Sequence, residues 1–193
     1  LVKERIIDTF LGAGAATLAS YFILPSWESK KIRKTMSEMV LKNLNYFLKT
    51  FERTNEEYNT QVAQRLSRKE LYVASSNLAS AFERMMNEPK RKRQNANDVN
   101  KFILLNNLFS ANVAAISQLI HEGETMGEQQ IREFRKVVNG MKENYACLNP
   151  EPLEIEYTVP SLGNNSIELQ ESLVSLVQHV GEIKKICSHH LES

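Results

Sequence analysis

The chain has 193 residues, of which 42% are hydrophobic and 24% are charged. This composition is typical of about one folded domain and excludes a wholly disordered chain. The two cysteines are too few for a disulfide-stapled secreted scaffold. The 24 basic and 23 acidic residues leave a net charge of +1, which excludes a generally basic nucleic-acid binder. We therefore expect no nucleic acid among the partners.

Residues 6–24 form the first apolar segment and read IIDTFLGAGAATLASYFIL, with Asp8 as the one charge. As a helix this segment would be about 28 Å long, close to the roughly 30 Å hydrocarbon core of a bilayer. Asp8 lies near one end of the segment, where a charge costs less than at the centre. We therefore predict a transmembrane helix over residues 1–27.

The residues that follow this segment predict its orientation. Trp27 lies where an interfacial aromatic anchor would sit. The next residues form a basic cluster that we expect to contact anionic lipid at the membrane interface: Lys30, Lys31, Arg33 and Lys34. Because basic residues flanking an apolar span mark the cytoplasmic side, residues 28–193 are predicted to be a cytoplasmic domain.

Small residues recur every four positions within the apolar segment, at Gly12, Ala16 and Ser20. This spacing lets helix backbones approach closely in lipid, so we expect other membrane helices as partners in addition to the lipid bilayer. Two alternatives stay open. One is a secretory signal peptide, against which Glu4 and Asp8 argue, and the other is a buried helix of a soluble bundle. The chain begins without Met, so we also expect a fragment or a processed product.

Apolar residues downstream recur three and four positions apart, which predicts about five amphipathic helices. The stripes cover residues 32–51, 71–85, 102–120, 131–145 and 169–187. Pro89 predicts that the second of these helices ends near Asn87, and polar residues favour a new start at Asn97 or Asp98.

Residues 153–159 alternate like a short strand but have no partner strand, so we predict an extended loop. The sequence thus predicts an all-α chain with one N-terminal transmembrane helix followed by a cytoplasmic bundle of about five helices.

The sequence contains none of the common catalytic motifs for phosphate, dinucleotide, acyl or zinc chemistry, so we expect no enzyme and no cofactor. Cys187, His189 and His190, with His179 two turns earlier, do not converge on one helix face, which argues against a metal site. The basic run at residues 90–93 lacks interleaved aromatic residues and is weak evidence for nucleic acid. Near a membrane, the same run could touch lipid headgroups.

Two segments carry a family resemblance. Residues 5–27 contain RIIDTxxG followed by PxW, and residues 68–89 contain RxxxYxAxxNLxxAFxRMxxEP. In this order they resemble the fusaric acid resistance protein-like (FUSC) family, within the aromatic acid exporter group. The resemblance covers roughly residues 5–90. It implies the last membrane helix and the C-terminal cytoplasmic domain of a larger bacterial inner-membrane exporter.

The resemblance further implies that the cargo is an organic anion such as an aromatic carboxylate, and that the soluble bundle serves assembly or regulation. We expect a homo-oligomer. Three residues are candidates for the transport path: Arg5 could attract an anion, Asp8 could pair with Arg5 or take part in proton coupling, and Thr9 could donate a hydrogen bond. A structural ion pair between Arg5 and Asp8 is the alternative for these two residues. The alternative for the whole chain is a soluble helical protein-interaction module without a transport role.

Overall fold

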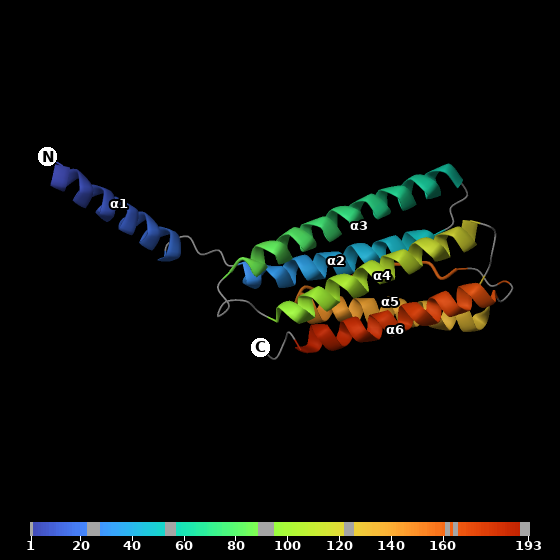
Figure 1. Cartoon of the computed structure of the whole chain (residues 1–193). Helices are drawn as coiled ribbons and strands as arrows, with labels where there is room; N and C mark the ends of the chain where they lie inside the picture. The colour runs from blue at the N-terminus through green and yellow to red at the C-terminus, as the bar shows by residue number, and fades with distance from the viewer. Residues whose placement is uncertain are drawn as a thin grey trace.

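The computed structural model describes residues 2–22, 28–52, 57–88, 95–121, 126–160, 163 and 166–189. These residues form six α-helices and no β-strand, so the prediction of an all-α fold is confirmed for this part of the chain. Figure 1 shows one helix apart from a bundle of the other five. The helices are α1 (Val2–Phe22), α2 (Glu28–Phe51), α3 (Glu57–Met86), α4 (Ala96–His121), α5 (Glu128–Leu148) and α6 (Ile167–His189).

The helix boundaries inside the bundle agree with the sequence pattern. α3 ends at Met86, one residue before the predicted stop, because Pro89 disfavours helical geometry in the residue before it. α4 begins at Ala96, one residue before the first predicted start. Residues 152–160 are extended without a partner strand, as predicted, and their alternating apolar side chains pack partly against the core.

The core of the bundle forms around α2, which contacts α3, α4 and α5. Phe47 of α2 is fully buried and stacks against Phe134 of α5 with ring centroids 5.1 Å apart. Its ring also lies 6.1 Å from that of Phe109 on α4. Burying each such side chain contributes about 1.5–3 kcal/mol, so the apolar stripes of the sequence are what hold these helices together.

Buried amides fix the register between helices within this apolar core. Asn43 of α2 donates a hydrogen bond to Asn106 Oδ1 of α4 at 2.8 Å. Asn144 of α5 donates to the carbonyl of Val180 on α6 at 3.1 Å. Because an unpaired buried amide is costly, sliding one helix past the other would break a bond that no water could readily replace.

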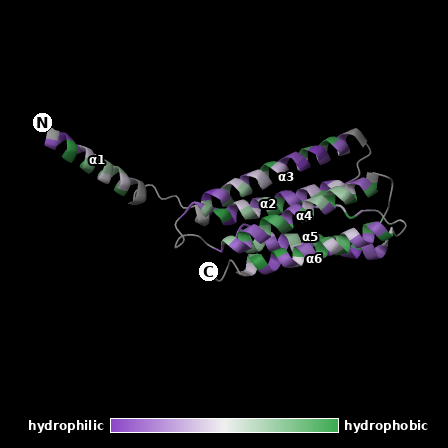
Figure 2. Cartoon of the chain, in the orientation of Figure 1, coloured by the Kyte–Doolittle hydropathy of each residue, from purple (hydrophilic) through white to green (hydrophobic). Residues whose placement is uncertain are grey.

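No other described helix contacts α1. Its side chains from residue 3 to residue 18 are all exposed, and Figure 2 shows hydrophobic residues along it, away from the bundle. The large apolar side chains in that stretch are more than half exposed, and Phe10 reaches 77%. They are Ile6, Ile7, Phe10, Leu11 and Leu18.

By length and composition, one helix in the described part of the chain could cross a membrane, and it is α4 over Ala96–Ile120 rather than the N-terminal helix. The described α1 ends at Phe22, so the apolar Ile23 and Leu24 of the predicted span lie outside the described residues. In α4, Phe102, Phe109 and other apolar residues of one face are buried in the core. One face of α4 therefore packs in the bundle, while Leu104 and Leu108 on the same helix are more than half exposed.

Candidate functional site

The three transport-path candidates lie on α1. Arg5, Asp8 and Thr9 are all exposed. Arg5 and Asp8 are three residues apart, so they share one side of the helix. Thr9 Oγ1 donates a hydrogen bond to the carbonyl oxygen of Arg5 at 2.8 Å, which satisfies the hydroxyl within the helix itself. The structure therefore groups the three residues on one helix, with no contact from the bundle.

The basic cluster lies at the start of α2. The side chain of Lys30, and the predicted aromatic anchor Trp27, are outside the described residues. Lys31 and Lys34 are exposed, as a lipid-facing cluster requires. Arg33 is half-buried and turned toward the bundle. The lipid contact stays a prediction for the two exposed lysines.

Arg33 binds the C-terminal end of α5. Its Nε donates to the carbonyl oxygen of Leu148 at 3.0 Å, and its Nη2 donates to the carbonyl oxygen of Cys147 at 2.7 Å. The last carbonyls of a helix have no partner inside the helix and carry the negative end of its dipole. Arg33 therefore acts as a side-chain cap that joins the first helix of the bundle to the fourth.

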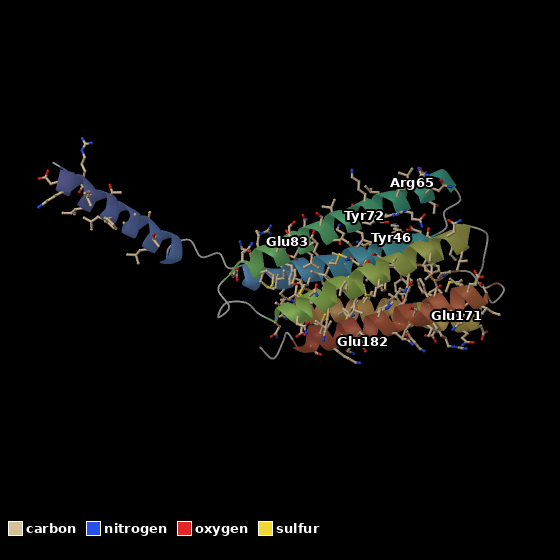
Figure 3. The ribbon with its side chains drawn as sticks, viewed as in Figure 1. Tyr46, Arg65, Tyr72, Glu83, Glu171 and Glu182 are labelled. Carbon is tan, nitrogen blue, oxygen red and sulfur yellow. The ribbon has the colours of Figure 1, made fainter. Side chains whose placement is uncertain are left out.

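The second motif of the family resemblance forms a polar cluster between α2 and α3. On α3, Arg68 Nε and Nη2 donate to the hydroxyl of Tyr72 at 3.1 and 3.0 Å. The guanidinium carbon also lies 5.4 Å from the centre of the Tyr72 ring. Tyr46 of α2 faces the same place, and Figure 3 shows the two labelled tyrosines on these neighbouring helices. We call the hollow that these residues line the Arg68 cavity.

The electrostatics of this cluster follow from burial and from one cation. Burial raises the pKa of Tyr46, and the nearby Arg68 opposes that shift. The hydrogen bond to Tyr72 raises the pKa of Arg68. At neutral pH the cluster therefore holds the guanidinium cation of Arg68 close to the neutral phenol of Tyr46.

Sequence reasoning assigned Arg68 and Tyr72 to a motif without a role and gave Tyr46 no role. The signal that could have found Tyr46 is its hydroxyl group, beside the apolar residues of a helix stripe.

Within the described residues, no three histidine, cysteine or acidic side chains gather where a metal ion could bind. Cys187 is buried in the core, and burial raises its pKa to about 12. His179 lies 3.4 Å from the amide of Asn112, and burial lowers its pKa. The side chain of His189, together with His190 and the basic run at residues 90–93, lies outside the described residues.

Comparison with known proteins relates the chain to a membrane protein. It is 24% identical over 112 residues to the inner membrane protein YccS of Escherichia coli (strain K12). The matched region is 58% of this chain and 16% of that protein, so the match spans about a sixth of the relative's length. No family model matches the chain, and no solved structure matches it either. The similarity associates the chain with a protein of the bacterial inner membrane.

Proposed function

We propose that the chain is a membrane-anchored helical domain of an inner-membrane protein, with α1 crossing the bilayer and the bundle of α2–α6 in the cytoplasm. The observation that carries this proposal is the exposure of the large apolar side chains of α1. Leaving each of five such side chains in water forgoes about 1.5–3 kcal/mol, or roughly 8–15 kcal/mol together. A helix that satisfies its own backbone hydrogen bonds can recover this energy in lipid.

The surface of α1 also suits packing against other membrane helices. A methyl group added at Gly12 or Gly14 would meet nothing within 4 Å, so the small residues leave an open strip along the helix. Such strips allow close helix contacts in lipid. We therefore propose that α1 packs against other membrane helices of the same protein or of a second copy in a homo-oligomer.

The exposed lysines at the start of α2 support the orientation. Lys31 and Lys34 project from the first turns after the apolar segment. Basic residues next to a membrane span are retained on the cytoplasmic side, where they also meet anionic lipid. With this orientation residues 1–5 lie on the opposite side of the membrane.

Retention in the membrane tests the anchor. The wild-type chain should stay with membranes washed in alkaline carbonate. The double variant Ala13→Lys/Ala16→Lys should be released, because each lysine near the centre of the span costs about 2.5–3.5 kcal/mol. The control Ser76→Lys/Ser80→Lys places the same two charges at exposed positions of the bundle and should be retained like the wild type. Release of the wild-type chain would overturn the proposal.

The resemblance to the FUSC family and the similarity to an inner membrane protein support a role in membrane transport. The finer proposal is export of organic anions such as aromatic carboxylates, with the bundle serving assembly or regulation. Arg5, at the membrane end of α1, would attract the anion, with Asp8 and Thr9 beside it. In the longer parent protein, Arg5→Ala should reduce export more than Lys31→Ala does. Equal export by the two variants would remove Arg5 from the transport path.

A second candidate function is a soluble protein-interaction module. It is favoured by apolar side chains that the bundle itself leaves exposed. Leu104 and Leu108 are about half exposed on the outer side of α4, and Leu66 is exposed on α3. Release of the wild-type chain from membranes would favour this function over the anchored domain.

A further inference from the structure

The Arg68 cavity lies between α2, α3 and α4 and has a volume of about 280 Å³. Drug-sized ligands occupy pockets of roughly 300–1,000 Å³, so this cavity is suited to a smaller molecule. Arg68 and Tyr72 are exposed and lie at its mouth, while Tyr46 is only 3% exposed and lies at its floor. A ligand could therefore enter from solvent and reach a buried phenol.

Hydrogen-bond donors without acceptors line this cavity. The hydroxyl of Tyr46 donates no hydrogen bond to any described residue, although the side chain is almost fully buried. The hydroxyl of Tyr72 accepts from Arg68 and likewise donates to no residue in the described part. Asn107 accepts from Ser75 through Oδ1 at 3.1 Å, which leaves its amide nitrogen without an acceptor there. Tyr72 and Asn107 are exposed to solvent and Tyr46 lines the cavity, so all three donors can bind water or the acceptor atoms of a ligand.

The lining of the cavity carries positive charge only. Arg68 is the one charged residue among the described residues that line it, and no carboxylate does so. The acceptor that the guanidinium has in the described structure is the Tyr72 hydroxyl. A guanidinium binds the oxygen atoms of an anion with two parallel hydrogen bonds more strongly than it binds a neutral group. A single cation surrounded by neutral donors matches a single negative charge.

Apart from Ser75 and Ser110, the remaining wall of the cavity is apolar. Met39 and Leu71 are almost fully buried, and Ala111 and Ala114 lie on the α4 side. These side chains offer no hydrogen bond and leave room for a short hydrocarbon part of a ligand. An inorganic ion would contact only the polar half of this surface.

We propose that the Arg68 cavity binds a small organic anion with one negative charge, whose oxygen atoms accept from Arg68, Tyr46 and Tyr72 and whose apolar part contacts Met39 and Leu71. The ligand comes from solution rather than from a lipid headgroup. Tyr46 lies about 27 Å along α2 from Glu28, the end that the apolar segment precedes. The site does not depend on whether α1 enters a membrane.

Binding of butyrate to the full chain in mild detergent tests the proposal, with saturation-transfer NMR on the ligand as the readout. Butyrate carries one charge and a short apolar chain. Butylammonium, with the same chain and the opposite charge, and inorganic phosphate, without an apolar part, should each bind at least tenfold more weakly. Equal binding of butyrate and butylammonium would overturn the proposal, as would the absence of any butyrate signal at 20 mM.

Matched variants locate the site. Tyr46→Phe removes only a hydroxyl that donates to no described residue, so the fold should be unchanged and butyrate affinity should fall at least tenfold. Arg68→Gln should lower the affinity by at least as much. Arg65→Gln is the control, because Arg65 is an exposed arginine of the same helix that does not line the cavity (Figure 3). Wild-type affinity in both cavity variants would show that butyrate binds elsewhere and would refute the site.

Discussion

Removal of the Arg33 side chain should destabilise the bundle far more than removal of a neighbouring lysine. Arg33 donates two hydrogen bonds to the last carbonyls of α5, at 2.7 and 3.0 Å. Hydrogen bonds of a charged donor are worth about 1.5–3 kcal/mol each, and a cation at a helix C-terminus adds about 0.3–1 kcal/mol. The residue is half-buried and water can partly replace the guanidinium, so we expect Arg33→Ala to lower the free energy of unfolding by about 2 kcal/mol.

Urea unfolding of the full chain in mild detergent, followed by circular dichroism at 222 nm, measures this loss. With a urea dependence of about 2 kcal/mol per molar for a domain of this size, the midpoint should fall by about 1 M. Lys34→Ala is the matched control, because Lys34 is an exposed cation one residue further along the same helix. Arg33→Lys should lie between the two, because an ammonium cannot reach both carbonyls. Equal midpoints for Arg33→Ala and Lys34→Ala would refute the capping role and favour Arg33 as a lipid contact.

Two further predictions concern the packing of α5 and α6. A methyl group added at Gly140 would lie 2.4 Å from Val180 Cγ1, whereas one at Gly181 would meet nothing within 4 Å. Gly140→Ala should therefore lower the free energy of unfolding despite its better helix propensity, and Gly181→Ala should raise it by up to about 1 kcal/mol. A rise in both would show that the helices are not in close contact. At pH 8, Cys187, whose pKa burial raises to about 12, should react with a thiol reagent only after unfolding, and the half-buried Cys147 should react first. Equal reaction rates in the folded chain would contradict the buried position of Cys187.

The sequence predicted the bundle well because each of its helices carries a local signal. Apolar spacing located the five helices, and Pro89 located the end of α3 within one residue. The alternating pattern of residues 153–159 predicted an extended conformation, and the absence of a second such segment in the chain predicted a loop rather than a strand. The helix positions and the end of α3 depend on neighbours only a few residues away.

The contacts that give single residues their roles could not be predicted in the same way. Arg33 belongs to a basic cluster in the sequence, but its partners are carbonyls more than 110 positions away. Tyr46 lies beside the apolar residues of a helix stripe, and only the folded arrangement places it opposite Arg68. Both depend on how α2 packs against other helices, which periodicity within one helix does not reveal.

The membrane span shows the limit of hydropathy as a criterion. In the described part of the chain, α4 is the one helix with a stretch long and apolar enough to cross a membrane, yet one face of α4 is buried in the core of the bundle. The described part of α1 has no such stretch, yet α1 has no partner in the bundle. Burial, which hydropathy does not measure, is what distinguishes the two helices.

Labelling from the two sides of the membrane tests the central claim most directly. In spheroplasts, a membrane-impermeant maleimide should label Lys3→Cys at once, because residue 3 precedes α1's apolar stretch and would lie outside. Lys69→Cys, at an exposed position of α3, should be labelled only after the membrane is permeabilised. Protection of both positions until permeabilisation would contradict the account, because it would place both ends of α1 on the cytoplasmic side.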